Sequence, residues 1–319
     1  MNTSTTLFPL GPQELSEFLS YDYTALAGHN SFGSAFLHPV IPFVSVALYL
    51  TLSNPICNWI RETFKLESKG PFIQNLTIIH SSILAVYSLW TFLGSTKIVL
   101  EYYSDHGLWG TLCDDDEVLW NAKGMGFWAT HFYLSKFYEF IDTWIVLLKG
   151  REPIFLQTYH HAGIVICMWA MVITSNTSVL VCVVLNSFIH TIMYTYYVYA
   201  ALGYSSPIKH YLTTAQMIQF FTGIGITVYL FALPKCMNPA QSVALGSLHL
   251  YAVYLIVLFW DFYKTSYLEG KKTKAEKSKE KAGKVEKNVA STENLSKESN
   301  NVEVDTDKPK GRKKAAKDN

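Results

Sequence analysis

Long apolar runs alternate along this chain with short polar segments. Seven of the runs approach the length of about 20 residues that carries a helix across the hydrocarbon core of a bilayer. They cover residues 33–52, 72–96, 124–148, 154–173, 178–201, 212–233 and 243–263. The pattern predicts an all-α polytopic membrane protein with seven transmembrane helices.

The composition strengthens this interpretation. Half of the 319 residues are hydrophobic and only 16% are charged, whereas an ordinary soluble domain carries about 25% charged residues. Sixteen of the 26 lysines and arginines follow Phe262, so the preceding chain is poorer still in charge. The near-neutral net charge therefore arises because the positive charge of the basic tail offsets the negative charge of the membrane-like body. No nucleic-acid partner is expected.

The chain divides into three expected parts. Residues 1–32 are predicted to lie in the lumen or at the membrane interface, and residues 33–268 form the seven-helix domain. Residues 269–319 mix lysines with small and polar residues and contain almost no large apolar side chain. Such a segment cannot bury enough surface to fold alone, so a disordered tail attracted to anionic lipid is expected.

The loops show an asymmetry of charge. Basic residues gather in alternate loops, at Arg61, Lys65, Lys69, Lys149, Arg151, Lys209 and after residue 263. The loop after the second run is instead acidic, with Asp105 and residues 114–117. Because short cytoplasmic loops carry the positive excess, seven crossings place the N-terminus in the lumen and the C-terminus in the cytosol.

This orientation bears on the five cysteines. Cys113 and Cys236 both fall in lumenal loops, where oxidising conditions permit a disulfide between them. No two cysteines have a Cys-x-x-Cys spacing, so no zinc site is indicated. Asn176 begins a lumenal glycosylation triplet but lies against the membrane, so little glycan is expected there.

Polar groups inside the apolar runs mark the chemical centre. Lys136, Glu139 and Asp142, followed by Thr143, share one face of a helix at intervals of three residues. After a short basic link, Gln157, His160 and His161 begin the next run. Ionisable groups within a membrane are costly and are rarely kept without pairing or a task.

The next two runs carry polar ridges of their own. Asn186, His190, Tyr194 and Tyr197 recur at four, eight and eleven residues, which makes a single stripe on a helix. Thr213, Gln216 and Gln219 follow at intervals of three. Polar faces on four consecutive membrane helices are most economically accommodated around a shared interior cavity.

Other interpretations remain open for these residues. The Lys136 network could be purely structural, lone amides often join helices, and His80, His131 and His249 fit helix packing. Gln-x-x-His-His also resembles one of the histidine boxes of membrane di-iron desaturases, but the other histidines are solitary, so no metal is expected. A seven-helix receptor or transporter is a further class, although neither internal repeats nor coupled ion sites are evident.

The motifs together resemble the ELO-type fatty acid elongases. The matching segments are Lys136-x-x-Glu139-Phe-x-Asp142-Thr143, Gln157-x-x-His160-His161, Asn186-x-x-x-His190-x-x-Met193-Tyr194-x-Tyr196-Tyr197 and Thr213-x-x-Gln216-x-x-Gln219. Their order and separation agree, and the resemblance spans all seven runs but not the tail. Gln157 stands where many members have histidine, which is similar to the subgroup that extends polyunsaturated chains.

The resemblance implies a reaction and a setting. An acyl-CoA condenses with malonyl-CoA, releasing carbon dioxide and CoA, to give a 3-ketoacyl-CoA two carbons longer; no bound cofactor is implied. The enzyme, a very-long-chain 3-oxoacyl-CoA synthase, would lie in the endoplasmic reticulum membrane. Its expected partners are membrane lipid, a ketoacyl reductase, a dehydratase and an enoyl reductase, and a homodimer is allowed.

Roles follow for the candidate residues. His160 attacks the acyl-CoA, His161 or His190 moves protons, and Asn186 and Gln157 donate hydrogen bonds; direct condensation with His160 as general base is the alternative. Lys136 holds Glu139 and Asp142. Supporting positions are Tyr194, Tyr197, Gln216 and Gln219. CoA phosphates are expected to meet Lys149, Arg151, Lys209 and Lys264, and the helices enclose an acyl tunnel, with Trp169 and Phe231 suggested as its floor.

Overall fold

A computed structural model of the chain describes residues 31–204 and 207–269, and every regular element within them is a helix. This confirms the all-α class. The predictions for the N-terminal segment and the basic tail fall almost entirely outside the described residues. The elements, in chain order, are α2 (Ser31–Leu37), α3 (Val40–Thr63), α4 (Pro71–Cys113), η1 (Val118–Ala122), α5 (Met125–Tyr138), α6 (Phe140–Leu148), α7 (Phe155–Ile173), α8 (Val179–Ala201), α9 (Ile208–Thr227), η2 (Val228–Ala232), α10 (Pro239–Tyr263) and η3 (Lys264–Glu269).

The chain divides into two compact units, Met1–Tyr263 and Lys264–Asn319. Of the second unit, the structure describes only the short π-helix η3, within which Lys264 and Glu269 form an exposed ion pair at 3.7 Å. The helical bundle and the candidate site belong to the first unit.

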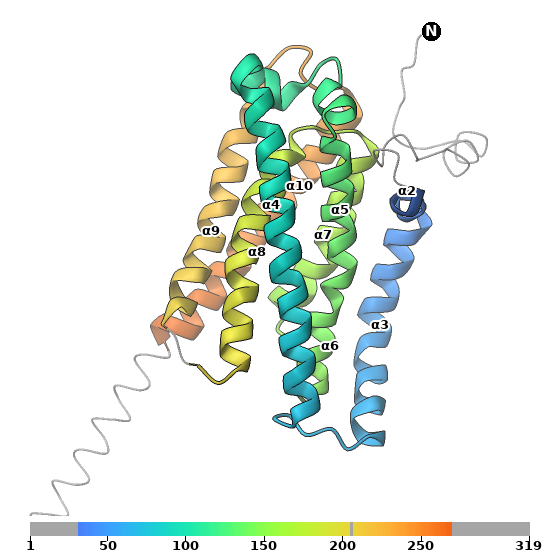
Figure 1. The fold of residues 1–319 in the computed structure, drawn as a ribbon, viewed down its shortest axis with the longest axis vertical. Helices are drawn as coiled ribbons and strands as arrows, with labels where there is room; N and C mark the ends of the chain where they lie inside the picture. Colours follow the sequence, from blue (N-terminus) through green and yellow to red (C-terminus); the bar gives the residue numbers. More distant parts are fainter. Residues whose placement is uncertain (1–30, 205–206, 270–319) are drawn as a thin grey trace, which may run out of the picture. The chain divides into compact units, whose positions relative to one another are not determined.

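Among the described residues, six helices are long and apolar enough to cross a membrane. The third predicted run, 124–148, is divided between α5 and α6, which meet at Glu139 and follow one another along the bundle in Figure 1. At this junction the Asp142 amide donates to the Glu139 carbonyl three residues back, a tighter bond than the α-helical one. The third predicted run is therefore two shorter helices rather than one, and the prediction of seven spans stays a prediction.

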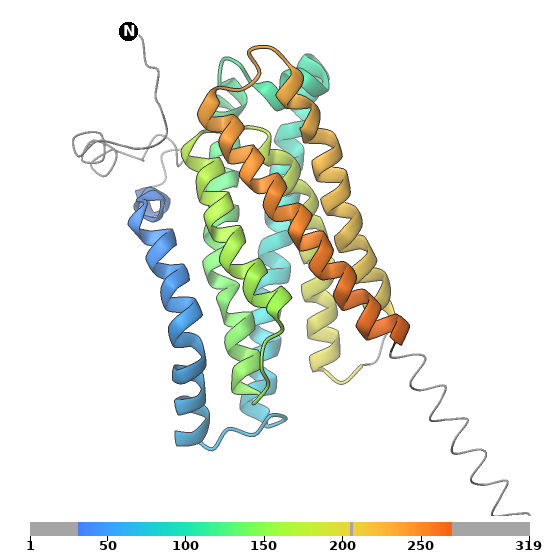
Figure 2. The ribbon, with the colours of Figure 1, turned by 180° about the vertical axis from the view of Figure 1, so that it is seen from behind.

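The helices of the first unit run side by side (Figure 1). Helix α4 packs along α8, and α3 packs against α6 and α7. Helix α10 contacts α7 and α9, and it crosses the bundle obliquely in the reverse view of Figure 2. The helices that carry polar stripes, α5 to α9, are thus brought around one interior.

Large apolar side chains cover much of the outside. Val86 on α4 is 69% exposed and Leu250 on α10 is 76% exposed. In water such faces would be an aggregation hazard, whereas the hydrocarbon core of a bilayer accepts them and leaves the backbone hydrogen bonds inside each helix. The outer surface therefore supports a multi-pass membrane protein.

Two predicted helix ends are wrong. The second run was expected to end near Lys97 and continue as a loop, but α4 extends to Cys113, with a break at Gly107 where φ is 66°. The first run was expected to end at residue 52, but α3 extends to Thr63. Hydropathy marks only the part of a helix that lies in lipid, whereas the backbone hydrogen bonds of the helix can continue into water. In that part of α4 the exposed side chains of Lys97 and Glu101 form an ion pair one helical turn apart, at 3.9 Å.

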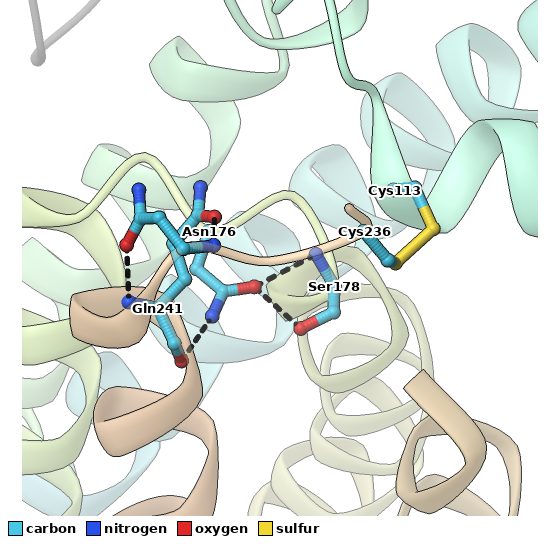
Figure 3. The surroundings of a disulfide bond; sticks show 6 residues. Cys113, Asn176, Ser178, Cys236 and Gln241 are labelled. Atoms are coloured by element: carbon cyan, nitrogen blue, oxygen red, sulfur yellow. Dashed lines mark hydrogen bonds between the residues drawn. A yellow bond between two sulfur atoms is a disulfide. The ribbon is translucent and has the colours of Figure 1, made fainter. Parts of the chain in front are cut away.

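The end of the bundle formed by the termini of α4 and α10 is tied by a disulfide. Cys113 and Cys236 are bonded, as the sequence predicts, across a separation of 123 residues. Figure 3 shows the neighbouring Asn176, whose amide nitrogen donates to the Gln241 carbonyl at 2.9 Å and whose side-chain oxygen accepts from the Ser178 hydroxyl at 2.6 Å. Asn176 is only 2% exposed, which agrees with the expectation of little glycan.

Candidate active site

A cavity of about 490 Å³ opens among α4, α6, α7, α8, α9 and α10. Lys149 and Lys209 line it where α6 ends and α9 begins. His160, Asn186 and Gln219 line its interior. The cavity therefore extends from a cationic region at one end of the bundle to the histidines within it.

A second, smaller cavity of about 70 Å³ adjoins the first. The two share a boundary formed by His160, Asn186, Gln219 and Phe220. Beyond it the smaller cavity is lined mainly by apolar side chains of α7 to α10, including Val181, Leu185, Ile224, Leu245 and Leu248. A larger cavity that contains the histidines, amides and lysines and a smaller, apolar cavity thus meet at His160.

Two of the three predicted histidines face each other across a carboxylate. One atom each of His160, His190 and Glu139 lie within 4.8 Å of one another, and His190 Nδ1 is 3.4 Å from Glu139 Oε1. The His161 ring centroid lies 5.4 Å from that of His160. All three histidines line the larger cavity, so α7 and α8 bring the imidazoles to one place.

His161 has a different environment from His160. It is 6% exposed, and among the described residues its Nδ1 has no hydrogen-bond partner. Its ring lies edge-on to Tyr49 of α3 with centroids 6.5 Å apart. His161 therefore has a free ring nitrogen near the site but does not share the carboxylate cluster.

Lys136 forms a buried ion pair with Glu139. Its Nζ lies 2.7 Å from Glu139 Oε1, and the side chains are 1% and 2% exposed. The same ammonium donates to Asn186 Oδ1 at 3.3 Å and lies 4.0 Å from the Phe132 ring centroid. Lys136 thus occupies the side-chain oxygen of Asn186 and fixes the orientation of the amide. The amide nitrogen of Asn186 remains able to donate to another group.

Asp142 does not belong to that ion pair, contrary to the prediction that Lys136 holds both carboxylates. His80 Nε2 lies 3.0 Å from Asp142 Oδ1, and the Tyr194 hydroxyl donates to Oδ2 at 2.7 Å. The junction at Glu139 places Asp142 on α6, where these partners from α4 and α8 reach it. The carboxylates therefore belong to two separate polar networks.

Gln157 is anchored by the α6 helix. Its Nε2 donates to Thr143 Oγ1 at 3.2 Å, and the Thr143 hydroxyl also lies 2.8 Å from the Tyr49 hydroxyl. Gln157 lines the larger cavity. Its amide carries a second proton, so it keeps a donor for a group in the cavity.

The predicted stripe of α8 faces the larger cavity throughout: Asn186, His190, Tyr194 and Tyr197 all line it. Thr213, Gln216 and Gln219 of the neighbouring α9 line it too, with Gln216 Nε2 3.3 Å from Met193 Sδ of α8. Gln219 is 8% exposed, and its Oε1 has no hydrogen-bond partner among the described residues. The polar ridges inferred from spacing thus converge as predicted.

The predicted CoA-binding residues separate into two groups. Lys149 and Lys209 line the larger cavity, whereas Arg151 is exposed and does not line it. Lys264 lies in the second unit.

Burial lowers the pKa of Lys149 from its ordinary value, and the neighbouring Arg151 charge lowers it further while Asp142 opposes the shift.

The suggested tunnel floor is wrong. Trp169 Nε1 donates to the Leu37 carbonyl at 2.8 Å and its ring packs against Phe43, so it lies toward α2 and α3. Phe231 is 47% exposed. Neither residue lines either of the two cavities. The smaller cavity is lined by Leu245 and Leu248 instead.

The cluster of Glu139, His160 and His190 also has the residue types of a metal site. Its charge environment argues against one. The Lys136 ammonium lies 2.7 Å from Glu139 Oε1 and already neutralises that carboxylate. A divalent cation bound beside it would meet an uncompensated positive charge.

Sequence reasoning missed two residues of the site. His80 was interpreted as a packing residue, yet it contacts Asp142 and is 2% exposed. Tyr251 of α10 was not singled out, yet its hydroxyl lies 2.8 Å from His160 Nδ1. A histidine within an apolar run was the available signal for His80, whereas Tyr251 is one of 20 tyrosines in the chain and had none.

The resemblance inferred from the motifs is confirmed by comparison with known proteins. The sequence model of the ELO family, described as GNS1/SUR4, matches residues 34–275. The chain is 32% identical over 235 residues to "Fatty acid elongase sre1" of Dictyostelium discoideum, which covers 72% of this chain and 84% of that protein.

Relatives with lower sequence identity are also named fatty acid elongases. "Fatty acid elongase 1" of Trypanosoma brucei brucei is 28% identical over 212 residues, 62% of this chain and 68% of that protein. "Very long chain fatty acid elongase 6" of Drosophila melanogaster is 27% identical over 212 residues, 64% of this chain and 65% of that protein.

Proposed function

This chain belongs to the ELO family, the GNS1/SUR4 proteins, and on that premise we propose that it catalyses the condensing step of fatty acid elongation. A long-chain acyl-CoA and malonyl-CoA react to give a 3-ketoacyl-CoA two carbons longer, with release of carbon dioxide and CoA. The enzyme is then an acyltransferase, a very-long-chain 3-oxoacyl-CoA synthase. The observation that carries the proposal is the position of His160 at the boundary between the larger cavity, which contains the lysines and amides, and the smaller apolar cavity.

In this proposal the two cavities receive the two ends of an acyl thioester. The alkyl chain enters the apolar cavity among α7 to α10 from the boundary at His160, and the CoA portion lies in the larger cavity with Lys149 and Lys209. Phosphates favour such ammonium groups. The thioester carbonyl then lies beside His160, and the apolar surroundings limit hydrolysis by water.

In the proposed mechanism His160 is the nucleophile. One imidazole nitrogen bonds to the acyl carbon, the carbon–sulfur bond breaks, and the CoA thiolate leaves and takes up a proton. Malonyl-CoA then loses carbon dioxide, and the resulting enolate attacks the acyl carbon and releases His160. His190 is suited to move protons because its Nδ1 lies 3.4 Å from Glu139 Oε1; His161 is the other candidate.

Asn186 and Gln157 supply hydrogen bonds for the developing negative charge. Lys136 fixes the Asn186 oxygen and Thr143 fixes one Gln157 proton, so each amide keeps a donor in a set orientation. Donors held in place before reaction stabilise an oxyanion or enolate without reorganisation. Lys136 and Glu139 themselves support this geometry and need not touch the substrate.

The substrate, location and partners are further parts of the proposal. Gln157, in the Gln-x-x-His-His form, favours polyunsaturated acyl chains. Lys149 and Lys209 lie at one end of the bundle and the Cys113–Cys236 disulfide lies at the other (Figure 1). Basic residues favour the cytosolic side and a disulfide favours the lumenal side. The proposal therefore has seven crossings of the endoplasmic reticulum membrane, with a lumenal N-terminus and a cytosolic C-terminus. The product would pass to a ketoacyl reductase, a dehydratase and an enoyl reductase, and the enzyme itself can form a homodimer.

The experiment separates the covalent route from direct condensation. Purified protein is incubated with a long-chain acyl-CoA alone, and His160 is examined for an acyl adduct by peptide mass spectrometry; labelled malonyl-CoA is then added. We expect an adduct on His160 that disappears as labelled 3-ketoacyl-CoA forms. Condensation without any adduct would leave His160 as general base, and no condensation with any acyl-CoA tested would overturn the proposed function.

A further inference from the structure

Tyr251 of α10 makes two contacts with His160, and together they determine where protons lie. The Tyr251 hydroxyl donates to the backbone carbonyl of His160 at 3.0 Å, and its oxygen lies 2.8 Å from His160 Nδ1. A phenol has one proton, and a carbonyl can only accept. With the single phenol proton donated to the carbonyl, the proton between Tyr251 and Nδ1 comes from the imidazole, and this arrangement, which satisfies both contacts, has Nδ1 as the protonated nitrogen.

The remaining nitrogen follows from that assignment. A neutral imidazole carries one proton, so protonation of Nδ1 leaves Nε2 with its lone pair. Nε2 is then the atom able to attack a thioester carbonyl. Free imidazole in water exchanges between tautomers, and a partner on one nitrogen selects between them, as a carboxylate does for the histidine of serine proteases.

The position of Tyr251 is itself tightly defined. A Cβ added at Gly163, one turn beyond His160, would lie 2.4 Å from Tyr251 Cε2, so only glycine admits the ring here. The ring also stacks on Tyr159, with centroids 5.4 Å apart and 22° between planes. Tyr251 is 8% exposed. Packing on α7 thus holds the hydroxyl against His160.

We propose that Tyr251 is a positioning residue that fixes His160 in the tautomer protonated on Nδ1 and so presents Nε2 to the acyl thioester. The inference rests on the proposed function of His160 as nucleophile. As Nε2 bonds to the acyl carbon and the carbon–sulfur bond breaks, positive charge develops on the imidazole. The hydrogen bond from Nδ1 to Tyr251 strengthens as that charge grows, which favours the transition state.

Tyr251→Phe removes only the hydroxyl and keeps the ring on Gly163. We expect the rate of adduct formation from acyl-CoA to fall about 10- to 100-fold, by analogy with the loss of a partner that orients a metal-ligating histidine, while the KM for acyl-CoA changes less than about twofold. Tyr254→Phe is the matched control, since Tyr254 lies on the same helix, contacts Tyr159 and is 46% exposed. It should match the wild type. An unchanged adduct rate in Tyr251→Phe overturns the inference.

A spectroscopic measurement on the wild type keeps the test decisive if Tyr251→Phe does not fold. In protein labelled with ¹⁵N-histidine, His160 is assigned by loss of its signals in His160→Gln. It should show a protonated Nδ1 and an unprotonated Nε2, and Tyr251→Phe should mix the tautomers. A protonated Nε2 in the neutral wild-type imidazole would refute the positioning role. If condensation occurs without an adduct, the covalent route fails, yet the tautomer measurement still decides the role of Tyr251.

Discussion

Lys136 and Glu139 form an ion pair with 2.7 Å between Nζ and Oε1, and neither side chain is more than 2% exposed. The pair joins α5 to the junction with α6, and through Asn186 it reaches α8. A lysine and a glutamate in such surroundings depend on each other, because removal of one leaves the other charge buried and uncompensated.

Replacing one member of the pair should therefore cost more than replacing both. We expect Lys136→Met to lower the free energy of unfolding by about 3–5 kcal/mol and to abolish condensation. The double variant Lys136→Met with Glu139→Gln should regain most of the stability but not the activity. Thermal unfolding in detergent and a condensation assay measure the two effects.

The control for this pair is Lys97→Met. Lys97 pairs with Glu101 on an exposed surface at 3.9 Å, so its loss should cost less than about 1 kcal/mol. Full condensation activity in Lys136→Met would show that the buried pair does not support the site.

Asn186 provides a test of the hydrogen-bond donor. Asn186→Leu keeps the approximate size of the side chain but removes the amide proton, and we expect kcat to fall about 100- to 1000-fold, the usual cost of removing one oxyanion donor. The KM for acyl-CoA should change little, because the donor acts on charge that develops during reaction. Steady-state kinetics measure both constants, and a change confined to KM would assign Asn186 to substrate binding instead.

The disulfide should stabilise the end of the bundle where α4 ends and α10 begins. Closing a loop as long as that between Cys113 and Cys236 contributes about 2–5 kcal/mol, so Cys113→Ser with Cys236→Ser should lower the Tm. Cys57→Ser is the comparison, because Cys57 is a free cysteine. Non-reducing peptide mapping that pairs Cys113 with another cysteine would contradict the assignment.

Lys149 and Lys209 should bind the phosphates of CoA. Lys149→Gln with Lys209→Gln should raise the KM for both CoA substrates by about tenfold, and added salt should raise the wild-type KM more than that of the variant. Lys69→Gln tests a basic residue of the loop before α4, which does not line the cavity, and should leave the KM unchanged.

The same lysine should give a pH dependence. Burial lowers the pKa of Lys149 from its ordinary value, so this ammonium loses its proton at a lower pH than an exposed lysine. The KM for CoA substrates should therefore rise as the pH increases through that range. Lys149→Arg, which stays protonated, should remove the rise. A KM independent of pH in the wild type would exclude Lys149 from phosphate binding.

Gly223 should set the length of the product. It lines the apolar cavity, and a Cβ placed there would meet nothing within 4 Å, so Gly223→Leu can fill the space without displacing the backbone. We expect the longest product to shorten by about two to four carbons, a length chosen from the approximate volume of a leucine side chain. Product profiling by gas chromatography measures the shift.

Gly225→Leu is the matched control, because Gly225 also has open space around its Cβ position but does not line the cavity. Equal product lengths from both variants would place the end of the acyl chain elsewhere.

Much of the fold and site was predictable from residue spacing. Asn186, His190, Tyr194 and Tyr197 share one face of α8, and all four line the larger cavity. The convergence of that face with His160 also followed, because polar groups in lipid must meet one another. Spacing could not show that Glu139 and Asp142 have different partners, since those partners come from α4, α5 and α8 and meet the carboxylates only when the helices pack.

The order of residues is enough to predict helices that cross a membrane and polar residues on shared faces, because periodicity and transfer energies act locally along the chain. Which groups touch depends on how the helices pack. Tyr251 and His160 are 91 residues apart, and their hydrogen bond exists because Gly163 lets α10 approach α7. Such proximity depends on the packing of whole helices, and no local pattern around Tyr251 records it.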